Sequence, residues 1–223
     1  VDLLWVAWDY QPICPAEIAD PQAPPLLQRA IAGADNGRLV GTGDVLIPNL
    51  AMRYGFRDVR GYDFPMDLRL AATLDRLGWD LKMTRIPKDQ VFPRLDPNVA
   101  IFLDRCSARC LMSDERQPAL DVSDRYSGFQ PWPLIAAGAI DAIYKNPNAY
   151  PRAWVARSVR VTDAADALDA LFDPNIDLRQ CSVIEEYTGG KLPIVTGDVQ
   201  VDFGVDEPEL IELNVHSQTG GLL

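Results

Sequence analysis

The chain has 223 residues, of which 48% are hydrophobic and 24% are charged, as is ordinary for a globular protein that buries a core. Its 21 basic and 32 acidic residues give a formal net charge of −11, so its surface repels nucleic-acid backbones and anionic membranes, and we expect no nucleic-acid partner. No run approaches the roughly 20 apolar residues of a membrane-spanning helix.

Four cysteines, Cys14, Cys106, Cys110 and Cys181, are too few to build a fold of this size on disulfides. Cys106 and Cys110 are spaced by one helical turn, which allows either a bridge or two thiols on one face, and we favour buried free thiols. A zinc site needs about four ligands, and His216, the single histidine, lies far along the chain. We therefore expect no metal, no cofactor and no catalytic triad.

The first third of the chain predicts an alternation of strands and helices. Residues 1–29 are rich in proline and predict an extended lead-in, apart from a short helix that begins at Pro25. There follow a strand over 37–43, a helix over 48–55 that ends at Gly55, a strand over 58–63 and a helix over 65–78. This order favours a βαβα layer.

The rest of the chain continues the mixed pattern. A helix and then a strand are expected over 98–113, a loop over 116–138, and strands over 141–146, 153–163 and 181–187. The helix over 163–175 has the clearest apolar periodicity, and either Thr162 or Asp163 is placed to cap it. From residue 193 the pattern alternates as in antiparallel β structure, with Pro208 at a turn or an edge. The predicted fold class is α/β, with a mixed sheet and flanking helices over 30–190 and an antiparallel β segment over 191–223.

Gly41 and Gly43 follow a short apolar run and precede a predicted helix, as in a phosphate-binding loop. The dinucleotide motif G-x-G-x-x-G requires a third glycine at the position that Leu46 occupies in this chain. Pro48 then removes a backbone amide that would help to hold a phosphate. We interpret both glycines as part of a strand-to-helix turn, so a soluble nucleotide-binding enzyme is the less favoured hypothesis.

Arg152 lies between prolines and aromatic residues in the segment NPNAYPRAW, residues 146–154. It could bind a carboxylate or a phosphate, with Tyr150 and Trp154 as a stacking face for a sugar. The reading that we favour is structural, with the prolines fixing the entry to a strand and Arg152 pairing with an acidic neighbour.

The carboxylates that could act as a general acid or base are Asp58, Asp63, Asp67, Glu185 and Glu186. Among 32 acidic residues such groupings arise by chance. Glu185 and Glu186 would also point to opposite faces of their predicted strand. We therefore assign no catalytic residue.

Several of these segments together resemble the YfhO-type family of bacterial membrane proteins. The segment over 37–63 matches the family pattern at Arg38, Pro48, Asn49, Gly55, Gly61, Tyr62 and Asp63. The segment over 143–161 matches it at Asn146, Pro151, Arg152 and Ala153, and residues 1–15 and 171–186 resemble further family segments in the same order. The family is similar to polytopic glycosyltransferases that use lipid-linked sugars and carry an extracytoplasmic portion after many transmembrane helices.

The resemblance implies that the chain is an excised extracytoplasmic portion of a protein in the bacterial cytoplasmic membrane. Its partners would be its own transmembrane region and a glycan or lipid-linked sugar. The family's catalytic acids would lie in membrane loops outside this chain, so we expect a non-catalytic domain that assists binding of a glycan or acceptor. Residues 191–223 would be the truncated start of a C-terminal β module. The candidate ligand-binding residues are Asn49, Tyr62, Asp63, Arg152 and Trp154, and the main alternative is a structural or assembly module without a ligand.

Overall fold

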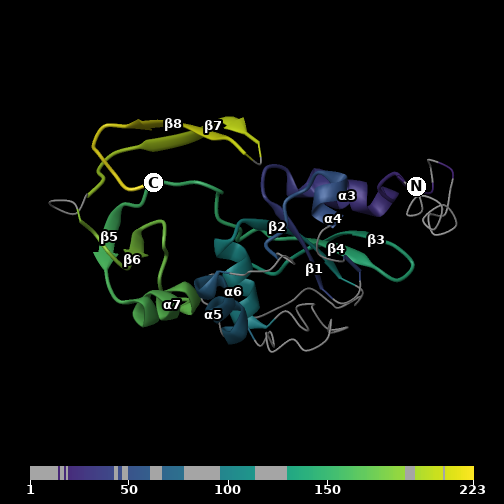
Figure 1. The fold of residues 1–223 in the computed structure, drawn as a ribbon, viewed down its shortest axis with the longest axis horizontal. Coiled ribbons are helices and arrows are strands. Elements are labelled where there is room, and N and C mark those ends of the chain that lie inside the picture. The colour runs from purple at the N-terminus through teal and green to yellow at the C-terminus, as the bar shows by residue number, and fades with distance from the viewer. Residues whose placement is uncertain are drawn as a thin grey trace, which may run out of the picture.

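The computed structural model is an α/β fold with a four-stranded mixed sheet, a parallel strand pair and an antiparallel hairpin (Figure 1). It describes residues 15, 18, 20–42, 45–46, 50–60, 67–77, 96–113, 130–188, 194–207 and 209–223. The predicted fold class is therefore confirmed. Within these residues, none of the helices combines the length and the apolar character that a membrane crossing requires.

The four-stranded sheet has the order β1-β2-β4-β3. Its strands are β1 (Arg38–Thr42), β2 (Ala108–Ser113), β3 (Leu134–Ala137) and β4 (Ala142–Lys145). β1 pairs with β2 in parallel, and the other two pairings are antiparallel. The predicted strands over 37–43, 108–113 and 141–146 are thus confirmed.

Both faces of the sheet are buried at β1, β2 and β4, where successive side chains enter different apolar clusters, whereas the edge strand β3 is mostly exposed. Leu39 and Cys110 enter the cluster that contains α3 (Pro25–Ala34), and Val40 and Leu111 enter the cluster that contains α6 (Pro97–Arg105). The helix predicted to begin at Pro25 is confirmed as α3. This helix and α6 are the apolar covers of the two faces.

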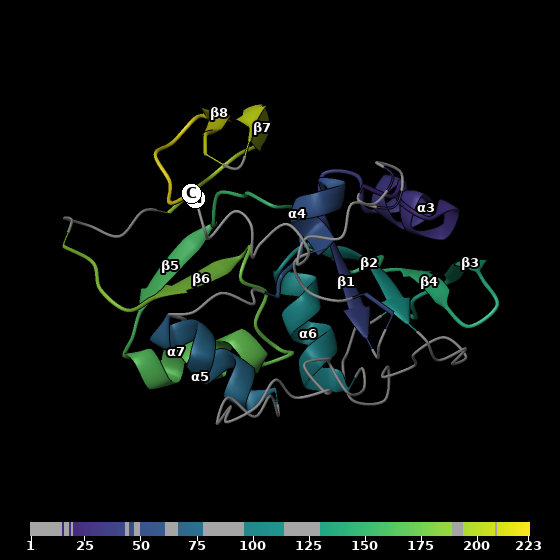
Figure 2. The same ribbon diagram turned by 45° about the vertical axis from the view of Figure 1, so that its right-hand side comes forward.

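The parallel pair consists of β5 (Ser158–Val161) and β6 (Cys181–Ile184), which are connected through α7 (Ala164–Phe172). Asp163 caps α7 by accepting a hydrogen bond from the Asp166 amide at 2.8 Å, which confirms one of the two expected caps. Phe172 of α7 stacks on Phe102 of α6 with the ring centroids 6.4 Å apart. Figures 1 and 2 both show α7 beside α5 (Leu68–Arg76), and an ion pair between Arg76 and Asp169 joins these two helices.

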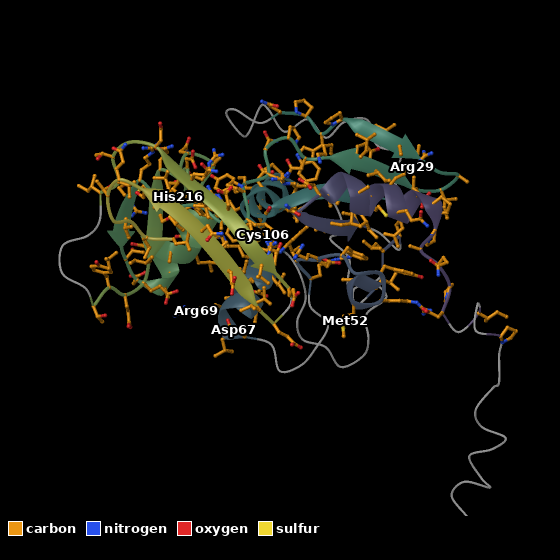
Figure 3. All side chains as sticks on the ribbon, turned by 90° about the horizontal axis from the view of Figure 1, so that it is seen from above. Arg29, Met52, Asp67, Arg69, Cys106 and His216 are labelled. Atoms are coloured by element: carbon orange, nitrogen blue, oxygen red, sulfur yellow. The ribbon has the colours of Figure 1, made fainter. Side chains whose placement is uncertain are left out.

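The antiparallel segment predicted from residue 193 is confirmed as a hairpin of β7 (Val199–Asp206) and β8 (Ile211–Ser217). Alternate residues share one apolar face, on which Val201 pairs with Val215 and Phe203 pairs with Leu213. His216 lies exposed on β8, and Figure 3 shows it on the hairpin. Pro208, expected at a turn or an edge, lies outside the described residues.

Several sequence predictions of secondary structure are wrong in this structure. Residues 58–60 are not a strand, because the Arg60 amide donates to Asp58 Oδ1 at 2.9 Å across a bend at Val59, while the Arg60 side chain donates to distant backbone carbonyls. β3 lies inside the predicted loop over 116–138, where pairing with β4 makes a strand of a segment with little pattern of its own. Glu185 and Glu186 lie beyond the end of β6 rather than within a strand.

The structure also places the cysteines. Cys106 follows the last residue of α6 and Cys110 lies in β2, so the two do not share a helical face. Cys106, Cys110 and Cys181 are all free thiols. Cys14 lies outside the described residues.

Candidate functional site

An open cleft of about 480 Å³ lies where β1 begins, α6 ends and the segment after β4 passes. Its polar lining comes from Arg38, Asp58, Arg105, Cys106, Arg152 and Trp154, and α5 and α7 form an apolar wall with Leu70 and Leu171. Pockets of this size are typical of small-molecule sites that combine apolar walls with a few placed polar groups. Figure 3 labels Cys106, which marks the position of the cleft toward the middle of the molecule.

Three arginines from separate parts of the fold line this cleft. Arg38 is the first residue of β1, Arg105 is the last residue of α6, and Arg152 lies between β4 and β5. Among the described residues of the lining, Asp58 is the one carboxylate, and Arg60 neutralises it through a buried ion pair with a 2.7 Å contact. The cleft is therefore cationic in a chain whose formal net charge is −11.

Arg38 is held by its backbone position and by one side-chain bond. Its Nη1 donates to the Cys106 carbonyl oxygen at 2.6 Å. Burial lowers the pKa of the Arg38 guanidinium, and the positive charges of Arg152 and Arg57 lower it further against an opposing effect of Cys106. Arg38 thus lies close enough to Arg152 and Arg57 to be repelled by both, which favours an anion among these three side chains.

Arg105 is buried and is fixed by the C-terminal end of α7. Its terminal nitrogens donate to the carbonyl oxygens of Ala170 at 2.5 Å, Asp173 at 2.7 Å and Ile176 at 2.6 Å. The Ala170 and Asp173 carbonyls lie at the C-terminal, negative end of the helix dipole, which suits a cation. The Nε donor is buried and has no hydrogen-bond partner among the described residues.

Arg152 pairs with a carboxylate, as the structural interpretation predicted, and it lines the cleft as well. It forms a short ion pair with Asp206 at the end of β7. Its guanidinium also lies over the ring of Phe203, 4.7 Å from the centroid. The side chain of Arg152 is 9% exposed, so this position is largely desolvated and its electrostatic interactions are strong.

Trp154 lies on the rim of the cleft, but Tyr150 does not join it in an exposed stacking face. Tyr150 is buried, its hydroxyl donates to Asp177 at 3.1 Å, and Arg179 lies 4.3 Å from its ring centroid. Trp154 meets the Tyr150 ring edge-on with centroids 5.6 Å apart and donates from Nε1 to the Leu178 carbonyl oxygen at 3.3 Å. Tyr150 therefore orients Trp154, and only the indole borders the cleft.

A second, mainly apolar cavity of about 360 Å³ adjoins the first. Thr73, Leu171 and Leu178 line both cavities. The second one is otherwise enclosed by α5, α7 and β6, with the 2.6 Å ion pair between Arg69 and Glu185 at its border. A cationic and an apolar cavity thus lie side by side.

Comparison with known proteins adds no relative: a scan against family models, a search of curated proteins and a search of solved structures each found no match. The YfhO-type resemblance therefore stays a prediction that rests on the residues quoted above.

The predicted ligand residues divide between the cleft and the undescribed part of the chain. Arg152 and Trp154 lie together at the cleft, whereas Asn49, Tyr62 and Asp63 lie outside the described residues. Asp67 caps α5 through the amides of Arg69 and Leu70, so it is a structural carboxylate. Arg105 and Asp206 were not identified from the sequence, because only the tertiary fold brings them to Arg152.

The glycine motif supports packing at the edge of this region. Gly41 lies within β1 rather than in a turn, and a Cβ atom there would meet the Leu46 Cβ at 2.4 Å. Its carbonyl accepts a 2.9 Å hydrogen bond from Arg60. Gly41 is thus needed for close approach of Leu46, and Gly43 lies outside the described residues.

Proposed function

We propose that the chain is a non-catalytic, extracytoplasmic domain of a membrane-integral, glycosyltransferase-like protein, and that its arginine-lined cleft binds the anionic group of a glycan or lipid-linked sugar. The observation that carries the binding proposal is the convergence of Arg38, Arg105 and Arg152 on one cavity. The compartment and the parent protein follow from the family resemblance.

The chemistry of the cleft favours a phosphate or carboxylate attached to a sugar. Guanidinium groups form paired, charge-assisted hydrogen bonds with such anions. The Trp154 indole at the rim offers an apolar ring face of the kind on which a sugar ring packs. The adjoining apolar cavity gives room for a non-polar part of the same ligand.

Calorimetric titration in about 0.1 M salt, where distant charges are screened, with glucose 1-phosphate, inorganic phosphate and glucose tests this proposal. We expect glucose 1-phosphate to bind most tightly and glucose not to bind measurably. Arg38→Met should weaken glucose 1-phosphate binding by about tenfold to a hundredfold, the effect of removing one charge-assisted hydrogen bond.

Arg29→Met is the matched control, because it removes one positive charge from the exposed side of α3, away from the cleft (Figure 3). Screening should leave its affinity within about twofold of the wild type. Equal losses in the two variants would contradict a specific site. No binding of either phosphate compound would favour a structural or assembly module.

A further inference from the structure

We propose that the Asp206 carboxylate occupies an anion subsite formed by Arg57 and Arg152, and that a ligand anion takes its place and frees the tip of the β7–β8 hairpin. This inference rests on the proposed function, since Arg152 belongs to the same cleft. It adds that Asp206 competes with the ligand for this site and that ligand binding releases the tip of the hairpin.

Asp206 fills this subsite incompletely. Both arginines contact one carboxylate oxygen, Oδ2, with Arg57 Nη2 at 2.9 Å and Arg152 Nη1 in a shorter contact. The other oxygen, Oδ1, is buried and has no hydrogen-bond partner among the described residues. A phosphate, with three acceptor oxygens, would engage more of the guanidinium donors than this carboxylate does.

The charge around Asp206 also favours an external anion. Arg57 and Arg152 share the Asp206 carboxylate. Arg38 lies near both arginines, and besides burial their positive charges lower the pKa of the Arg38 guanidinium. Within the described part of the chain, the single negative charge of Asp206 thus faces the positive charges of Arg38, Arg57 and Arg152. A dianionic ligand that replaced Asp206 would balance them better.

The hairpin is fastened to the rest of the described chain at two ends. At its base, the Val195 amide donates to the Arg157 carbonyl oxygen at 2.9 Å, and Ala156 bridges to Leu222. At its tip, the contacts are the two ion pairs of Asp206, a 2.9 Å bond from Arg57 to the Asp206 carbonyl, and the Arg152–Phe203 stack. Within the described residues, hydrogen bonds to the hairpin from elsewhere reach only these two places.

Loss of the tip contacts would therefore leave the hairpin attached by its base alone. In Figures 1 and 2 the hairpin lies along one side of the molecule, apart from the four-stranded sheet. A two-stranded hairpin by itself is marginally stable in water. Binding of an anion at Arg57 and Arg152 should consequently raise amide hydrogen exchange along β7 and β8.

The test combines calorimetry and hydrogen exchange on the whole chain, with inorganic phosphate and glucose 1-phosphate as probes. Asp206→Asn removes the competitor, and Asp202→Asn makes the same charge change at an exposed position of the same strand. If the released form is populated at about 10%, Asp206→Asn should tighten phosphate binding by about tenfold. Asp202→Asn should change it by less than about twofold.

We expect phosphate to raise hairpin exchange in the wild type, and we expect the Asp206→Asn hairpin to exchange rapidly without phosphate. If the wild type binds phosphate while the two variants match each other in phosphate affinity and in hairpin exchange, then Asp206 does not compete with the ligand. The proposed function would still stand in that case. If neither the wild type nor Asp206→Asn binds either probe, the proposed function fails. In that case, equal hairpin exchange in Asp206→Asn and Asp202→Asn would separately contradict the claim that the Asp206 ion pairs hold the tip of the hairpin.

Discussion

Replacing Arg60 by methionine should lower the free energy of unfolding by about 3–5 kcal/mol, the usual cost of removing one partner from a buried ion pair. The Arg60 side chain is 0% exposed and its partner Asp58 is 3% exposed. Arg60 also donates to the carbonyl oxygens of Gly41 and Leu46, each at 2.9 Å. Methionine would leave a buried carboxylate and two carbonyls without these donors.

Urea denaturation followed by circular dichroism measures this loss. Arg69→Met is the control, because its ion pair with Glu185 has similar geometry but an arginine side chain that is 77% exposed. Such surface pairs contribute at most about 1 kcal/mol. The double variant Arg60→Met/Asp58→Leu should recover part of the loss, since it no longer buries an unpaired charge. If Arg60→Met costs no more than Arg69→Met, the buried pair does not hold this region together.

Two further predictions concern packing and pH. Gly41→Ala should destabilise the protein by about 1–3 kcal/mol, because its Cβ would meet the Leu46 Cβ at 2.4 Å, whereas Gly220→Ala meets nothing within 4 Å and should be near neutral in the same urea assay; equal effects would contradict the close approach. Burial, opposed by the charge of Arg38, raises the pKa of the Cys106 thiol from 9.0 to about 11. The contribution of the protonated Cys106 thiol to the free energy of unfolding is fully present below pH 9. It is lost as the pH rises toward 11, because only the unfolded chain releases the thiol proton in this range. Relative to Cys106→Ala, the wild type should therefore lose up to about 1.4 kcal/mol per pH unit in this window, and parallel curves for the two proteins would refute the assignment.

Elements with strong local signals are the ones that the sequence predicts well. α7 has apolar periodicity and an aspartate at its cap, and β2 is a short apolar run directly after a capped helix. β3 has no such signal, because its place depends on pairing with β4. Residues 58–60 look like a strand from their sequence, but the hydrogen bonds of Arg60 to distant carbonyls outweigh that tendency.

The candidate site is only partly visible in the sequence for the same reason. Arg152 is marked by its prolines and aromatic neighbours, and its acidic partner was expected, but nothing local indicates that the partner is Asp206 of the hairpin. Arg105 has no local signal at all, because its position at the cleft depends on the packing of α6 against α7. Clusters of charge built from distant segments become visible only when the fold is known.

The measurement that tests the binding site most directly is an NMR titration with glucose 1-phosphate that follows arginine Nε and tryptophan Nε1 resonances. We predict saturable shifts at Arg38, Arg105, Arg152 and Trp154, which line the cleft, and none at Trp132, which is buried in the core. Shifts confined to other residues, or no saturable shift at all, would contradict an anion site in the arginine-lined cleft.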